Sequence, residues 1–422
     1  MKQRTLEEIQ QKINEGKANV FTAQEICDLI EKGEKIEFED VDVITTATKG
    51  LMSGTTAIVS FKVSEPKEFQ KAKKMTLNGI PAYVGPCPNE YLGVVDAIIF
   101  GTQHSLENPN YGGGHLFRDL IENKEIDVKV KTIENMEIET KIKLQDMSFA
   151  KLLAIRNAFK NYLAFVNPTH EPVKTIFAVT DFKGPLYEAT FCGCGALNPI
   201  QNDPDLEVFG IGSPILMNGA KGYIIGEGTR SSQEKPNLTA IADMRKMEPE
   251  YTGGFLTSAG PEVINTWAVP IPILNEKILN NAKKIDKDIH LTIVDVVGRG
   301  PVGETTYGEV WKNVYSIEFK ENGCKDCPNL KTCNIEEICP TKAFTINKGI
   351  DKSLCFNCGT CLVHCVKDAF KGQMGTIKIG NKKIPIVCRQ SDRMGAIKLA
   401  IDLKSLILKG EFPLVNPTDK IY

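Results

Sequence analysis

The sequence predicts a large N-terminal domain of α/β or α+β class, a small cysteine-rich α+β domain and a C-terminal helix. Three observations support this division. Strand and helix patterns alternate loosely over most of the 422 residues, eight of the 13 cysteines lie between residues 324 and 365, and a hairpin pattern followed by helical periodicity closes the chain. A typical domain length of about 150 residues also suggests two or three domains. We therefore expect domains over 1–315 and 316–374, followed by a hairpin and helix in 375–422.

The composition excludes several classes of protein. Thirteen cysteines cannot all pair, and their clustering is unlike that of a short disulfide-stapled secreted chain. The start has no apolar signal-peptide segment, and no apolar run reaches the roughly 18 residues of a membrane span. A net charge of −2 provides no basic surface for nucleic acid. We expect a cytoplasmic protein with reduced thiols and with neither a nucleic-acid nor a membrane partner.

The first elements are indicated by capping signals and periodicity. Residues 5–15 and 22–30 predict helices, and Thr22 and Glu25 form a capping box that opens the second. Residues 41–46 predict a strand. A second strand is expected over 57–63.

The middle of the chain mixes both periods. Alternation over 126–144 predicts a hairpin. Residues 148–166 have the strongest helical spacing, with Leu152, Phe159 and Leu163 expected on the buried face. Four further strands are expected, over 176–179, 186–191, 223–225 and 291–297.

The end of the chain predicts a hairpin and a helix. The hairpin is expected to turn at Gly380-Asn381. Ser391 is expected to cap a helix from Met394 to Lys409, ended by Gly410. The apolar positions expected to dock this helix are Ile397, Ile401 and Leu408.

Four closely spaced cysteines form the strongest motif. The run is Cys355-x2-Cys358-x2-Cys361-x3-Cys365. Three thiolates on one tight loop can reach three irons of a [4Fe–4S] cluster. The fourth cysteine lies too far along the chain for that cluster, and in two-cluster ferredoxins it ligates the other one.

A looser set of cysteines precedes this motif. The run is Cys324-x2-Cys327-x5-Cys333-x5-Cys339, followed by Pro340 as at the exit of a ferredoxin loop. We therefore expect two [4Fe–4S] clusters with crossed ligands and one-electron transfer. One set is Cys324, Cys327, Cys333 and Cys365, and the other is Cys339, Cys355, Cys358 and Cys361. Zinc is the alternative, although the x2-x2-x3 spacing is poor for zinc.

The scattered cysteines include three candidate catalytic residues, Cys192, Cys194 and Cys87. Cys192-Gly193-Cys194-Gly195 suits a redox pair, a persulfide carrier or metal ligands; the alternative is two buried small residues. Cys87 lies between Pro86 and Pro88, on a rigid loop suited to a nucleophile. Cys27 is expected in the core and Cys388 as a structural or spare thiol.

A glycine loop is the candidate substrate-binding segment. Gly112, Gly113 and Gly114 precede His115 and a predicted helix, where backbone N–H groups and the helix dipole favour a carboxylate or phosphate. A plain turn is the alternative. His115 and His104 are the plausible general bases among the five histidines. The glycines of 298–303 match a dinucleotide fingerprint only formally, because no helix pattern follows.

A series of motifs resembles a known family. In order, these are Val41-Asp42-Val43-Ile44-Thr45-Thr46, Tyr111-Gly112-Gly113-Gly114-His115, Arg156-Asn157-Ala158 with Asn161-Tyr162, Asn202-Asp203-Pro204, Gly210-Ile211-Gly212, Glu227-Gly228-Thr229, Asp243-Met244-Arg245-Lys246-Met247 and Ile271-Pro272-Ile273-Leu274. Together they resemble the archaeal homocysteine-biosynthesis domain of the aspartate-semialdehyde sulfurtransferase type over residues 5–297. Fusion to a ferredoxin module resembles the branch called methanogenesis marker protein 16.

The resemblance implies a cysteine persulfide that delivers sulfur to an aldehyde, followed by reduction through iron–sulfur clusters. It also implies family cysteines near Ser53 and between residues 132 and 140, where this chain has none. We therefore expect either that the thiol has moved to Cys192 or Cys194, or that the domain has another task.

Three hypotheses follow from these patterns. The first is a redox-coupled sulfurtransferase-like enzyme of methanogenic archaeal metabolism, with a small acidic substrate and a redox protein partner. The second is a non-enzymatic electron-transfer or cofactor-maturation subunit that docks onto such a partner. The third adds a metal site on Cys192, Cys194 and Cys87.

Overall fold

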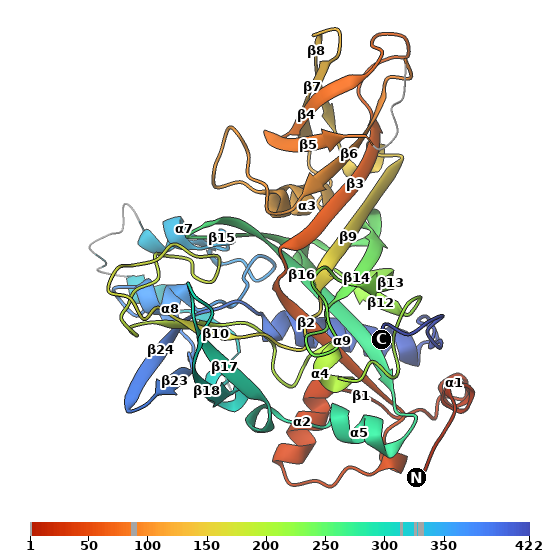
Figure 1. Cartoon of the computed structure of the whole chain (residues 1–422), viewed down its shortest axis with the longest axis vertical. Helices are drawn as coiled ribbons and strands as arrows, with labels where there is room; N and C mark the ends of the chain where they lie inside the picture. Colours follow the sequence, from red (N-terminus) through yellow and green to blue (C-terminus); the bar gives the residue numbers. More distant parts are fainter. Residues whose placement is uncertain (1, 86–90, 313–314, 325–326, 328–332) are drawn as a thin grey trace.

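The chain builds one long mixed β-sheet that runs through the molecule (Figure 1). This computed structural model describes residues 2–85, 91–312, 315–324, 327 and 333–422. The strands of the long sheet follow the order β1 (Val20–Thr22), β2 (Val43–Leu51), β16 (Gly260–Pro272), β12 (Pro214–Met217), β13 (Ala220–Glu227), β14 (Leu238–Asp243), β9 (Phe149–Asn157), β3 (Gly54–Lys62), β6 (Val94–Phe100), β5 (Ile80–Val84), β4 (Ala72–Leu77), β7 (Ile126–Thr132) and β8 (Glu137–Ile142), with β15 (Gly253–Thr257) beside β16. The expected hairpin of 126–144 is confirmed as β7 and β8.

A second sheet joins distant parts of the chain. Its order is β18 (Pro301–Thr306), β17 (His290–Asp295), β10 (Ala164–Val166), β11 (Ala189–Phe191), β24 (Lys382–Arg389) and β23 (Thr376–Ile379). The expected C-terminal hairpin is confirmed as β23 and β24. Because β24 pairs with β11 in parallel, the segment after residue 375 belongs to the same sheet as strands from the N-terminal part of the chain.

Helices cover the sheets at several places. They are α1 (Leu6–Asn14), α2 (Ala23–Glu31), α3 (Gly113–Ile121), α4 (Pro199–Asn202), α5 (Glu276–Ala282), α6 (Tyr307–Val310), α7 (Asn334–Ile338), α8 (Thr360–His364) and α9 (Arg393–Leu408). Capping boxes at Thr5 and Thr22 open the first two, so the expected N-terminal helices are confirmed. No helix of the described residues is long and apolar enough to cross a membrane.

The last helix differs from the expectation in its cap and its face. Its N-cap is Asp392 rather than Ser391. It packs on β2 and β16 through a buried stripe. Ile401 and Leu408, expected to dock, are about half exposed at 51% and 47%. The buried stripe is Ala396, Leu399, Ala400, Leu403 and Ile407. Two of these residues are alanines, whose small side chains allow close approach of the helix to the sheet.

The helix expected over 148–166 is wrong. Residues 149–157 form β9, which lies between β3 and β14, and a loop leads to β10. Along β9 the buried residues alternate, with Ala150, Leu152 and Ala154 inaccessible to solvent. The pairing of both strand edges therefore overrides a helical spacing of the apolar residues. The strand expected over 176–179 is also absent, since these described residues form turns and irregular backbone.

The cysteine-rich segment is a small region with its own apolar core. It contains α7, α8 and two antiparallel strand pairs. The pairs are β19 (Glu318–Phe319) with β22 (Phe370–Lys371), and β20 (Phe344–Thr345) with β21 (Gly349–Ile350). The core residues are Ile317, Ile335, Phe344, Ala369 and Phe370, and five cysteines pack against them.

Candidate functional site: an arginine cavity and a four-cysteine cavity

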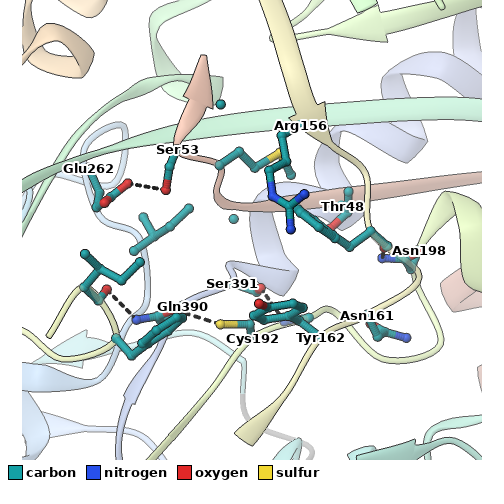
Figure 2. A pocket seen from close by; sticks show the side chains of 18 of the residues that line it. Thr48, Ser53, Arg156, Asn161, Tyr162, Cys192, Asn198, Glu262, Gln390 and Ser391 are labelled. Carbon is teal, nitrogen blue, oxygen red and sulfur yellow. Dashed lines mark hydrogen bonds between the residues drawn. The ribbon is translucent and has the colours of Figure 1, made fainter. Parts of the chain in front are cut away.

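A cavity of about 300 Å³ lies where β11 and β24 end (Figure 2). Cys192 directly follows β11, and Gln390 and Ser391 directly follow β24. The two strands are parallel neighbours, so their carboxyl ends meet at one edge of the sheet. Ligands of α/β proteins commonly bind at such an edge. We call this the arginine cavity, because Arg156, Arg230 and Arg299 line it together with Cys192.

Cys192 presents its thiol to this cavity. Its Sγ donates a hydrogen bond to Oε1 of Gln390 at 2.8 Å. Burial raises the pKa of the Cys192 thiol, and the positive charge of Arg299 opposes that effect. The thiol is therefore protonated at rest and held in one orientation by Gln390.

The loop that carries Cys192 is fixed by hydrogen bonds. The Tyr307 hydroxyl donates to the Cys192 carbonyl at 2.6 Å, and the Gly193 N–H donates to Ser391 Oγ at 2.8 Å. Trp311 Nε1 donates to the Gly193 carbonyl at 3.1 Å. Gly193 has a φ of +111°, and a Cβ there would overlap the Tyr307 hydroxyl. The Cys-Gly-Cys sequence thus serves a rigid turn that only glycine can form.

Cys194 faces the interior instead. It is fully buried, its Sγ accepts from the Thr48 hydroxyl at 3.7 Å, and it donates to the Lys49 carbonyl at 3.7 Å. Burial raises the pKa of this thiol as well. Both cysteines are free thiols. Of the two candidates, the structure therefore places only Cys192 in the arginine cavity.

The arginine cavity carries a surplus of positive charge. Arg299 lies 4.4 Å from the ring centre of Phe177, and Arg156 lies 5.0 Å from that of Phe159. The ion pairs found among the described residues include none of the three cavity arginines. Burial and the charge of Arg230 lower the pKa of Arg156. An anion in this cavity would relieve that repulsion and pair with the guanidinium groups.

A serine and a glutamate lie across the cavity from Cys192 in Figure 2. Ser53 Oγ donates to Glu262 Oε2 at 2.7 Å. Burial raises the pKa of Glu262, and the hydrogen bond from Ser53 opposes this. Ser53 is the position near which the family resemblance implies a cysteine, so that position and Cys192 share one cavity.

The glycine loop does not offer its N–H groups to a ligand. The Gly113 N–H donates to the Gln103 carbonyl at 2.7 Å, and the Gly114 N–H donates to the Gly101 carbonyl at 2.9 Å. The Gly112 N–H donates to Nδ1 of His115 at 3.0 Å. The glycines permit close packing, since a Cβ at Gly114 would meet backbone atoms of β15 and β16. These contacts correct the interpretation of Gly112 to His115 as an anion-binding loop.

The two candidate general bases lie away from the arginine cavity. His115 stacks on Tyr111 with ring centres 5.6 Å apart, and burial lowers its pKa to about 4. His104 is exposed and forms a backbone bridge with Gly112. Neither histidine lines the cavity that contains Cys192.

A second cavity lies inside the cysteine-rich segment. It has about 30 Å³ of free space and apolar walls that include Ile338, Phe344 and Phe356. We call it the four-cysteine cavity, because Cys339, Cys355, Cys358 and Cys361 line it. Burial raises the pKa of the Cys361 thiol, and the charges of the other three thiols add to this. These four residues are one of the two expected crossed sets.

The remaining cysteines of the segment are also neighbours. Burial raises the pKa of Cys324, and the charges of Cys365, Cys327 and Cys333 add to this. Among the described residues no three thiol, imidazole or carboxylate groups lie close enough to hold a single metal ion. A cluster differs, because each of its thiolates binds a separate iron of a cage. The additional metal site expected on Cys192, Cys194 and Cys87 gains no support, since the first two face apart; Cys87 lies outside the described residues.

Comparison with known proteins shows the family to which the chain belongs. Residues 18–414 match the family described as homocysteine biosynthesis enzyme, sulfur-incorporation, and the chain belongs to that family. An uncharacterized protein of Methanothermobacter thermautotrophicus is 45% identical over 97% of this chain and 94% of its own length.

Two relatives have named activities. L-aspartate semialdehyde sulfurtransferase of Methanosarcina acetivorans is 32% identical over 78% of this chain and 67% of its own length. The protein of that name in Methanocaldococcus jannaschii is 33% identical over 69% of this chain and 58% of its own length. No solved structure matches the chain.

Sequence reasoning missed most of the residues that surround Cys192. The three arginines come from distant segments, and Gln390 and Ser391 lie almost 200 positions after Cys192. One signal was present: Arg156, Asn161 and Tyr162 belong to a motif of the family resemblance, and all three line the cavity.

Proposed function

We propose that this chain transfers sulfur through Cys192 to a small acidic carbonyl substrate bound in the arginine cavity. The observation that carries this proposal is the placement of one thiol among three arginines that have no carboxylate partner in the described structure. The family description, which names sulfur incorporation, supports the same activity.

The first step accounts for the protonated resting thiol. An anionic persulfide donor reacts as Cys192–SH + R–S–S⁻ → Cys192–S–S⁻ + R–SH. One S–S bond breaks and one forms, and the thiol proton passes to the leaving sulfur. The cavity favours an anionic donor and stabilises the terminal persulfide charge through its arginines.

The second step delivers sulfur to an aldehyde. Two relatives are named for L-aspartate semialdehyde, which combines an aldehyde with a carboxylate. The overall change is R–CHO + Cys192–S–SH + 4 e⁻ + 4 H⁺ → R–CH₂–SH + Cys192–SH + H₂O. Arginine pairs well with carboxylates, so Arg156 or Arg299 would orient the substrate while Cys192 presents the sulfur.

The electrons would come from two [4Fe–4S] clusters, which supply one-electron transfers when bound. The donor chemistry fits: the four-cysteine cavity collects Cys339, Cys355, Cys358 and Cys361 in an apolar environment. The other set is Cys324, Cys327, Cys333 and Cys365. Burial raises the pKa of Cys324 and the charges of the last three add to this, so these thiols are neighbours. Two clusters also require a redox protein partner to reload them. We place this activity in the metabolism of methanogenic archaea, because the relatives come from such organisms.

The test is persulfide labelling of the anaerobically prepared protein after exposure to a sulfane-sulfur donor. Cys192→Ser is expected to abolish labelling and sulfur transfer, whereas the matched control Cys194→Ser retains at least half of each. Full labelling of Cys192→Ser would refute the role of this thiol. Absence of any sulfur transfer by the wild-type protein, together with a stable complex with a redox partner, would instead favour the electron-transfer subunit.

A further inference from the structure

A carboxyl group in the arginine cavity takes no part in the two steps proposed above. Glu262 belongs to β16, is 6% exposed and lines this cavity. The ion pairs among the described residues do not include it. Burial without a cationic partner favours the neutral form of a carboxyl group. The cavity therefore contains a group that can give a proton as well as a thiol that can carry sulfur.

The alternation of side chains along β16 directs Glu262 away from helix α3. Neighbouring side chains of a strand point to opposite faces of the sheet. Val263 is on the side of α3, because a Cβ at Gly101 would meet both Val263 and Phe117 of that helix. The charged groups of α3 line a different cavity, which does not include Glu262. These groups are His115, Arg118 and Asp119.

A serine hydroxyl orients the carboxyl group. Ser53 lies in the turn between β2 and β3, and its Oγ donates to Glu262 Oε2 at 2.7 Å. The Met52 N–H in the same turn donates to the Val263 carbonyl at 2.8 Å, so the turn is joined to the strand that carries Glu262. Burial raises the pKa of Glu262, and the hydrogen bond from Ser53 opposes this. Ser53 thus both orients the carboxyl group and limits how far its pKa rises.

The same turn is connected to the thiol. The Leu51 N–H donates to the Gln390 carbonyl at 3.2 Å, and the Gln390 side chain accepts from Cys192 Sγ at 2.8 Å. Ser53 follows Leu51 by two residues, which span at most about 7 Å. Carboxyl group and thiol are therefore held by one hydrogen-bonded frame, and they face the same cavity from opposite sides (Figure 2).

We infer that Glu262 is the general acid that protonates the aldehyde oxygen when the persulfide of Cys192 attacks the carbonyl carbon. This inference rests on the proposed function and deepens it. The step is Cys192–S–S⁻ + R–CHO + Glu262–COOH → Cys192–S–S–CH(OH)–R + Glu262–COO⁻. A C–S bond forms, the electron pair of the C=O π bond passes to oxygen, and that oxygen takes the proton. Glu262 regains a proton from solvent, which reaches the cavity at the exposed Arg230 and Arg299.

The charges in the cavity favour a carboxylic acid at this place. The persulfide and the substrate carboxylate are both anions, so an ionised Glu262 would repel them, whereas the neutral acid does not. Bound anions also pair with the arginines and leave less positive charge to stabilise an ionised Glu262. The other charged or titratable groups that line the cavity are Arg156, Tyr162, Cys192, Arg230 and Arg299.

The experiment follows the addition step alone. The anaerobically prepared full chain is loaded with persulfide, mixed with L-aspartate semialdehyde without any electron donor, and quenched at intervals with the persulfide-labelling reagent. Addition to the aldehyde masks the terminal sulfur, so the loss of label measures this step. Glu262→Gln, which still accepts from Ser53, is expected to slow the masking by about 10²- to 10⁴-fold, the usual contribution of a general acid. Loading of Cys192 with sulfur is expected to stay unchanged.

The pH profile separates an acid from a merely structural residue. The wild-type masking rate is expected to fall as the pH rises through the pKa of Glu262, because only the protonated form reacts, and this fall is expected to be absent in Glu262→Gln. Ser53→Ala removes a bond that favours the carboxylate, so the fall is expected at a higher pH. Glu248→Gln removes an exposed carboxyl group outside the cavity and is the control, with an unchanged rate and profile.

Two results would overturn the inference. One is masking by Glu262→Gln at the wild-type rate, and the other is an unchanged pH profile in Ser53→Ala. Because Ser53 is exposed, the second variant decides the question even if Glu262→Gln does not fold. Failure of the wild-type protein to accept sulfur on Cys192 would refute the proposed function instead, so the two failures are distinguishable.

Discussion

The arginine cavity and the four-cysteine cavity both contain cysteine, yet their size and lining are opposite. The first has about 300 Å³ of space, three arginines and one thiol. The second has about 30 Å³, apolar walls and four thiols. Space and unpaired charge suit an exchangeable anionic molecule, whereas close apolar packing around several thiols suits a resident group that never leaves. The difference shows that the surroundings of a cysteine, rather than the cysteine itself, indicate its chemistry.

The largest effect is expected from testing whether the ligand sets cross. The double variant Cys361→Ala/Cys365→Ala is expected to lose nearly all of about eight irons, since it removes one ligand from each cluster. The matched double variant Cys358→Ala/Cys361→Ala removes two ligands from one cluster and is expected to keep about four irons. Iron and sulfide counting after anaerobic reconstitution measures both. Retention of about four irons by the first variant would show that the sets are not crossed.

A smaller effect is expected from removing positive charge in the arginine cavity. Arg299→Ala is expected to raise the KM for the acidic substrate by about 10- to 100-fold, because a hydrogen bond to a charged group contributes about 1.5–3 kcal/mol. Steady-state kinetics with the reconstituted protein measure this. Arg245→Ala is the control, since Arg245 pairs with Asp243 at 2.8 Å outside the cavity. Equal KM values for both variants and the wild type would contradict an anion site at Arg299.

A third region, around His115, belongs to neither the arginine cavity nor the four-cysteine cavity. It is therefore expected to affect stability and not the chemistry of Cys192. Burial lowers the pKa of His115 to about 4 in the folded protein, below its ordinary value of 6.5. Between these values the unfolded chain binds more protons, so the free energy of unfolding falls as the pH drops from 6.5 towards 4, by about 2–3 kcal/mol at most.

The variant His115→Gln tests this role. Gln is a standard residue at the third position of a capping box and does not titrate. Urea unfolding at several pH values is expected to show a weaker loss of stability in acid for the variant than for the wild type. Persulfide labelling of Cys192 is expected to stay unchanged. A large loss of labelling would indicate that His115 takes part in the reaction of Cys192. That result would contradict the separation of the His115 region from the arginine cavity.

The sequence predicted those parts of the fold that depend on local signals. The capping boxes at Thr5 and Thr22 and the alternation over β7 and β8 are properties of neighbouring residues, and the structure confirms them. The sequence pattern misled at β9, because Leu152, Phe159 and Leu163 fit a helical spacing, while Leu152 also fits the alternation of a strand. Only the strands on both sides of β9 decide between the two, and they come from residues 54–62 and 238–243.

The residues of the candidate site also divide into those that the sequence predicts and those that only the tertiary structure brings together. The spacing of the eight clustered cysteines determined, from the sequence alone, which thiols are expected to act together, since ligands of a cluster come from tight local loops. The choice between Cys192 and Cys194 needed tertiary structure, because both lie in one short turn and only its packing sends one side chain to the cavity and the other inward. Gln390 lies far from Cys192 in the chain and meets it because the parallel strands β11 and β24 bring their carboxyl ends to a common edge. The arginines reach the same cavity from other elements, Arg156 from β9, Arg230 from the segment after β13 and Arg299 from the turn between β17 and β18.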